Sequence, residues 1–236
     1  MVDGAWLYGL LPRWHDARYA HLIQTYLEEL GEGVPDRNHV VIYRSLLTAH
    51  GCDQWQHLDD DYFVQGTLQL ALAHHAAHFL PEVIGFNLGY EQLPLHLLIS
   101  AYELNELGID PYYFTLHVTV DNAASGHATK ALQGLFDSLP HIADKDDFYR
   151  RVTNGYKLSA AGVGTQCVID GFDLDDEVLT IFLAKPHLVD LPRRCQRHMS
   201  EPDDLVRNPP GRDLTFQFPE QRLVKRMGCR RVRRRE

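Results

Sequence analysis

The sequence predicts an all-α protein, and three observations favour this fold class. Leu and Ala recur at the i, i+3, i+4 spacing of one helix face through most of residues 1–184. The alternation of Val, Ile and Thr that marks strands is almost absent there. Residues that begin or end helices separate the periodic segments. We therefore expect a bundle of seven helices joined by short links.

Glycine, proline and aspartate set the boundaries of the first four expected helices. The first ends at Gly31, with Pro35 just beyond, and the second ends at Gly51. Three successive aspartates at 59–61 favour the start of the third, and Pro81 starts the fourth. These helices span about 14–30, 38–50, 61–79 and 82–107.

The same signals define the rest of the bundle. Gly108 ends the fourth helix. Asp110 and Pro111 open the fifth, which Pro140 closes. The last three helices span about 110–139, 144–158 and 172–183.

Charge and proline content divide the chain near residue 185. Residues 1–184 hold 9 Lys and Arg against 25 Asp and Glu, whereas residues 185–236 hold 14 against 7. Six prolines in the second stretch would break any helix. We therefore expect a helical domain over 1–184 and a basic, Pro- and Arg-rich irregular tail over 185–236. The acidic domain should attract neither nucleic acid nor an anionic membrane.

Composition excludes several classes of protein. No apolar run approaches the ~20 residues of a membrane span, and the N-terminus lacks the pattern of a signal peptide. The four cysteines form no CxxC pair, so we expect a cytoplasmic protein without a thiolate zinc site. Twelve of the 14 histidines lie in the first 141 residues, among the carboxylates. Imidazole and carboxylate together suit iron, manganese or zinc.

One segment combines these ligand types at a helical spacing. His117 and Asp121 are four residues apart, on the same side of a helix with apolar neighbours, so they form either a metal site or a structural ion pair. His127 lies about 80° away around an unbroken helix. It joins the pair only if 122–126, which contains weak helix formers, leaves the helix. Otherwise it is an ordinary exposed histidine.

Two other acids stand out by position. Glu91 lies within an apolar helix, where an unused acid is costly, and Pro94 is expected to kink the helix beside it. Glu28 and Glu29 lie at a helix C-terminus, where they oppose the helix dipole. Such acids are either functional or simply solvated.

These segments resemble a known family. GFNLGYEQLPLHLLISAYELNELGIDPYYFTLHVTVDNAASGHA, from Gly85 to Ala128, is similar to the core of the haem-oxygenase-like iron-containing redox enzymes, also called haem-oxygenase-like di-iron oxidases. YLEELGEGVPDRNH, from Tyr26 to His39, resembles their first ligand segment. The resemblance extends over roughly 10–184. It implies a haem-oxygenase-like seven-helix bundle, here with an irregular C-terminal extension.

The resemblance also implies a set of metal ligands. The family pattern takes an acid and a histidine from the first core segment, a glutamate from the second, and a histidine, an acid and a histidine from the third. The matching positions are Glu29, His39, Glu91, His117, Asp121 and His127. Asp36 is a rival to Glu29 as the first acid. Five residues separate Asp121 from His127, where the family usually has two.

The activity implied is that of a non-haem di-iron oxidase or oxygenase, with two irons that activate O2 to oxidise a small organic substrate. Its expected partners are O2, that substrate and an electron donor, with a homodimer as a candidate assembly. Two alternatives stay open: a cofactor-free or haem-binding relative on the same scaffold, and a non-catalytic interaction protein.

Overall fold

The computed structural model describes residues 2–92, 95–122, 124–141 and 144–184. The chain divides into two compact units, residues 1–164 and residues from 165 onward. Every regular element in the described residues is a helix, which confirms the all-α prediction. No helix among these residues is long and apolar enough to cross a membrane.

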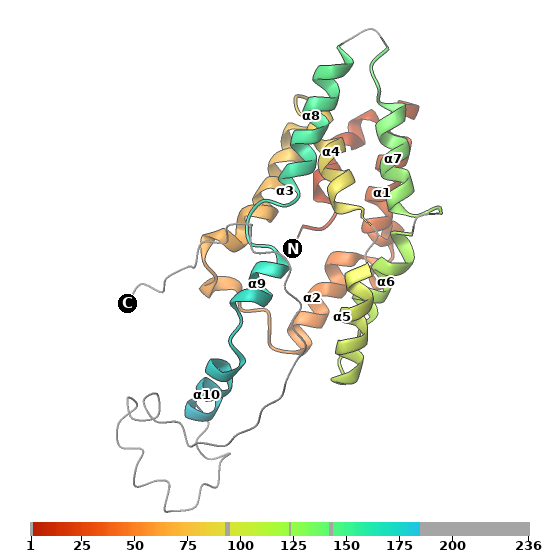
Figure 1. The fold of residues 1–236 in the computed structure, drawn as a ribbon. Helices are drawn as coiled ribbons and strands as arrows, with labels where there is room; N and C mark the ends of the chain where they lie inside the picture. Colours follow the sequence, from red (N-terminus) through yellow and green to blue (C-terminus); the bar gives the residue numbers. More distant parts are fainter. Residues whose placement is uncertain (1, 93–94, 123, 142–143, 185–236) are drawn as a thin grey trace, which may run out of the picture. The chain divides into compact units, whose positions relative to one another are not determined.

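The hydrophobic core of the first unit lies between its N-terminal segment and four α-helices. The 3-10 helix η1 (Ala5–Arg13) packs against α1 (Ala20–Glu29), α3 (Val64–His75) and α4 (Leu80–Tyr90). Helix α8 (Lys145–Leu158) runs beside α4 (Figure 1). The most deeply buried apolar side chains are Trp6, Leu7, Leu10, Leu22, Val83, Ile84 and Phe86.

Glycines allow α4 and α8 to approach closely. A Cβ at Gly85 of α4 would collide with the Val152 carbonyl of α8, and a Cβ at Gly155 of α8 would collide with the Glu82 carbonyl of α4. Only glycine permits two helix backbones to meet at this distance. Helix α4, which ends just before Glu91, is therefore packed backbone to backbone against α8.

The remaining helices of the first unit pack in two places. Helix α2 (His39–Ala49) and helix α5 (Leu95–Glu106) both pack against α6 (Tyr112–Val120), and α7 (His127–Asp137) packs against α1 (Figure 1). The long helices predicted over 82–107 and 110–139 are therefore each two shorter ones, α4 with α5 and α6 with α7. Both interruptions fall beside predicted metal ligands.

The second unit contains the short helices α9 (Thr165–Gly171) and α10 (Leu174–Ala184). Helix α10 matches the expected helix over 172–183, whereas α9 was not expected. The tail predicted over 185–236 lies outside the described residues, so the division of the chain at residue 185 stays a prediction.

Candidate metal centre

A tight reversal of the chain brings the first two predicted ligands together. Glu29 is the last residue of α1, and His39 is the first residue of α2. Gly31 adopts the left-handed conformation, with φ +67°, and a side chain there would collide with the backbone just before α2. The side-chain amide of Asn38 donates a hydrogen bond of 3.3 Å to the Leu30 carbonyl. Glu29 and His39 therefore face each other across this turn.

A second turn separates α6 from α7. The Asn122 side chain accepts hydrogen bonds from the N–H groups of Ala124 and Ser125, at 3.0 and 2.9 Å. Helix α6 stops before Asp121, and α7 begins at His127. Residues 122 and 124–126 therefore leave the helix, so the condition for His127 to join Asp121 is met, and His127 turns back toward Asp121.

Glu91 lies where α4 stops. Its N–H still donates to the Asn87 carbonyl at 2.9 Å, but its ψ of 49° ends the helix. The kink predicted near Glu91 is therefore a complete helix end. The Glu91 side chain turns inward and is only 5% exposed.

The predicted ligands meet in two clusters. In the first cluster, His39 Nδ1 lies 2.6 Å from Glu29 Oε2. His117 Nδ1 donates to the Tyr113 carbonyl at 2.8 Å, which leaves Nε2 facing the cluster, 3.5 Å from Asp3 Oδ2. The first cluster therefore comprises Asp3, Glu29, His39 and His117.

The second cluster surrounds the buried ring of His127. Its Nδ1 lies 3.0 Å from Asp121 Oδ1, 3.2 Å from Glu29 Oε1 and 3.3 Å from Glu91 Oε2. Glu29 thus belongs to both clusters, with Oε2 facing the first and Oε1 facing the second.

Several of these buried atoms have close neighbours but no hydrogen bond. They are Glu29 Oε2, His39 Nδ1, Asp121 Oδ1 and His127 Nδ1. Leaving such atoms unsatisfied in a protein interior costs several kcal/mol in total, because each lost partner costs about 1–3 kcal/mol. A cation that accepts their lone pairs removes this penalty. The donor set, imidazole nitrogen with carboxylate oxygen, fits iron.

Charge in the metal-free centre is balanced by protons. Burial raises the pKa of Glu91 to about 8, and repulsion from the Glu29 carboxylate adds to this effect. Burial opposes charge on His127, but the carboxylates of Asp121, Glu29 and Glu91 outweigh it and raise the pKa of His127 to about 12. Glu29 is also buried, yet contacts with His127 and His39 lower its pKa to about 2. The metal-free protein therefore places protons where a cation would compensate the carboxylates.

The six predicted ligands all converge on this centre. The rival acid, Asp36, is exposed and belongs to neither cluster. Asp3 was missed by sequence reasoning, because it lies outside any helix and has no spacing relation to the other ligands. Its Oδ2 accepts a hydrogen bond of 3.1 Å from the Tyr113 hydroxyl.

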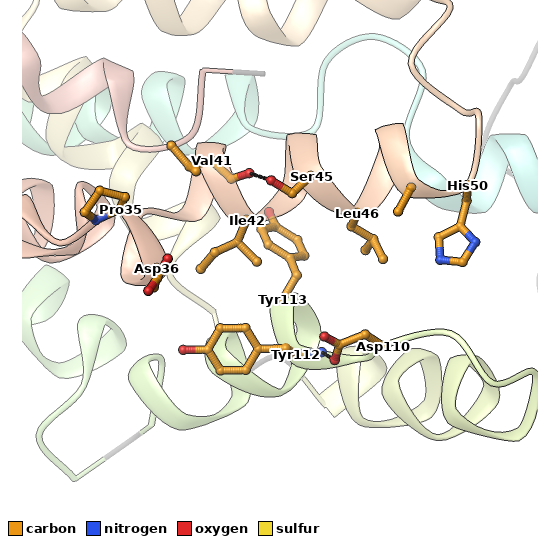
Figure 2. Close-up of a pocket in the computed structure, with 11 residues that line it drawn as sticks. Pro35, Asp36, Val41, Ile42, Ser45, Leu46, His50, Asp110, Tyr112 and Tyr113 are labelled. Carbon is orange, nitrogen blue, oxygen red and sulfur yellow. Dashed lines mark hydrogen bonds between the residues drawn. The ribbon is translucent and has the colours of Figure 1, made fainter.

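Three cavities lie near the centre. The largest, about 420 Å³, runs between α2 and the start of α6 beside Ile42, Leu46 and Tyr112, and it reaches no residue of either cluster (Figure 2). The smallest, about 210 Å³, is lined by Asp3 and His39 of the first cluster. Its other walls are Val2, Val40, Tyr43, Gly66, Gln69, Tyr90 and Tyr113. The third, about 290 Å³, is lined by His39 and Glu28, so two of the three cavities reach a candidate metal ligand, and only the smallest reaches two.

Comparison with known families agrees with this chemistry. A family model described as iron-containing redox enzyme matches residues 1–160, which include both clusters. The chain belongs to this family. This iron-containing redox enzyme is thus an oxidoreductase with an all-α, haem-oxygenase-like fold, as the sequence resemblance implied. Searches of curated proteins and of solved structures found no significant match.

Proposed function

We propose that this iron-containing redox enzyme is a non-haem di-iron oxidase or oxygenase, with one iron in each cluster. The observation that carries the proposal is the position of Glu29, whose two carboxylate oxygens face different clusters. A carboxylate placed in this way suits a pair of neighbouring metal ions. The remaining ligands, two imidazoles in the first cluster, one in the second and further carboxylates, supply a donor set that iron accepts.

Each part of the chain then has a defined task in the reaction. Two bound irons would supply the electrons and the binding position that O2 activation requires. The helix ends at Glu29, Glu91 and Asp121 hold the carboxylates in place, and the packing around His127 excludes water from the second cluster. The cavity of about 210 Å³ beside Asp3 and His39 would admit a small organic substrate. An electron donor would complete each turnover.

The metal content tests this proposal directly. Metal-free protein is loaded anaerobically with Fe(II), excess metal is removed, and iron per chain is measured by elemental analysis. We expect about two irons per chain, and Mössbauer spectra after exposure to O2 should show a coupled diferric pair.

Other outcomes would point elsewhere. A single iron per chain would contradict the paired centre. Haem absorbance in the purified protein would favour a haem-binding relative, and a protein that retains no metal would favour a cofactor-free or non-catalytic one. Oxygen consumption by the loaded protein, with a chemical reductant present, provides an independent measure of O2 activation.

A further inference from the structure

The carboxylate of Glu28 lies behind the His127 ring, on the side away from the second cluster. We propose that Glu28 is a positioning residue that fixes the tautomer and orientation of His127, so that Nδ1 is aimed at a metal ion. This inference rests on the proposed iron centre. It assigns a task to an acid that touches neither predicted iron position.

The two nitrogens of the His127 ring face different groups. Nδ1 faces the carboxylates of Glu29, Glu91 and Asp121 at 3.0–3.3 Å. Nε2 lies 2.9 Å from Glu28 Oε2 and makes a hydrogen bond with it. The ring is fully buried, so these groups are its polar partners in place of water.

Two further contacts hold the Glu28 carboxylate in place. Lys130, one turn after His127 on α7, forms an ion pair with it. Gln24, one turn earlier on α1, donates a hydrogen bond of 2.9 Å to Oε1. An ion-paired carboxylate only accepts hydrogen bonds, so His127 Nε2 must donate. In the neutral ring, the lone pair then resides on Nδ1, which is the atom that faces the cluster.

The end of α1 therefore contacts His127 from two sides. Adjacent helical residues point about 100° apart, so Glu29 reaches the cluster while Glu28 reaches the far edge of the same ring. Metal-bound histidines generally donate their second N–H to such an acceptor, and loss of the acceptor typically lowers metal affinity about 10–100-fold.

The test compares Glu28→Ala, Glu28→Gln and Glu32→Ala. Glu32 is an exposed acid four residues further along, in the turn between α1 and α2, so its removal matches the change in charge. Metal-free proteins are titrated with Zn(II), which is diamagnetic, and circular dichroism checks that each variant is folded. We expect the wild type to bind two zinc ions. Glu28→Ala should lower the affinity of one position about 10–100-fold and leave the other unchanged, with a smaller loss for Glu28→Gln and none for Glu32→Ala.

A spectroscopic measurement separates positioning from general stabilisation. In zinc-loaded protein with 15N-labelled histidine, the His127 Nε2–H should give a slowly exchanging NMR signal in the wild type. In Glu28→Ala, this proton should exchange rapidly with water. Wild-type affinity and an unchanged Nε2–H signal in Glu28→Ala would overturn this inference alone. A wild type that binds no zinc would overturn both this inference and the proposed iron centre.

Discussion

Glu29 is shared by the two clusters, because its Oε2 atom faces the first cluster and its Oε1 atom faces the second. We expect Glu29→Ala to weaken iron binding at both positions, by more than the ~10–100-fold that is typical of outer hydrogen-bond partners. Glu91→Ala should weaken only the second position. Iron per chain, measured by elemental analysis across a range of Fe(II) concentrations, distinguishes the two patterns. A Glu29→Ala protein that still binds one iron tightly would show that Glu29 serves a single metal.

His117 provides a second test at the level of a single residue. Its ring lies at the edge of the first cluster, with its centroid 4.4 Å from that of the His39 ring, and is not part of the hydrophobic core. We expect His117→Ala to lower the iron content from about two to about one per chain, while the helical circular dichroism signal is retained. Global unfolding of this variant would mean that His117 is structural.

Proton release provides a third test. In the metal-free protein the pKa of His127 is raised to about 12, that of His117 to about 9 and that of Glu91 to about 8. All three groups hold a proton at pH 7, and metal binding must displace these protons. Metal affinity should therefore rise with pH, most steeply below about pH 8, where all three groups still hold the proton that the metal must displace. Calorimetry in buffers of different ionisation enthalpy should find about three protons released, with one fewer for Glu91→Gln.

The set of six candidate ligands was implied by the family resemblance, whereas the residue pattern alone singled out His117, Asp121, Glu91 and the acids at the end of the first helix. Asp3 could not be predicted, since its role depends on a tertiary contact with Tyr113, more than 100 residues away. The role of Glu28 was equally hidden. The sequence singles out both glutamates at the end of α1, but only the structure separates the one that faces the clusters from the one behind His127.

At the level of elements, the helix breaks are the features that build the site. Weak helix formers indicated where the helix before His127 could open, and Pro94 indicated a kink near Glu91. The length of the non-helical segments was not predictable. Turn hydrogen bonds such as those that the Asn122 side chain accepts become favourable only when neighbouring helices hold both ends of the turn.

The turn between α6 and α7 has a critical glycine. A Cβ at Gly126 would collide with the Val120 carbonyl and with the backbone of Asn122. We expect Gly126→Ala to cost about 1–3 kcal/mol of stability, as overpacking commonly does, and to weaken metal binding at the second cluster through displacement of His127. Gly164→Ala is the matched control, because open space surrounds that position. Thermal unfolding and zinc titration measure the two effects. Equal behaviour of the two variants would show that the turn tolerates the extra methyl group.

At the level of the whole molecule, both clusters and the hydrophobic core are built from residues before 165. The all-α class was predictable from periodicity, whereas the 3-10 helix η1 was not, although it supplies much of the core. Truncation after Lys185 should therefore leave the helical circular dichroism signal and the iron content unchanged. Insoluble protein, or loss of iron, would show that the basic tail contributes to the fold.

The number of carboxylates in the two clusters also has a consequence for the oxidation state of the proposed irons. Four carboxylates, from Asp3, Glu29, Glu91 and Asp121, surround the two proposed iron positions. Two ferrous ions would neutralise them completely, whereas two ferric ions would leave two uncompensated positive charges in a largely buried site. Because uncompensated buried charge is costly, the ligand set by itself favours the ferrous state. Oxidation should therefore be coupled to the arrival of an anion or the loss of protons.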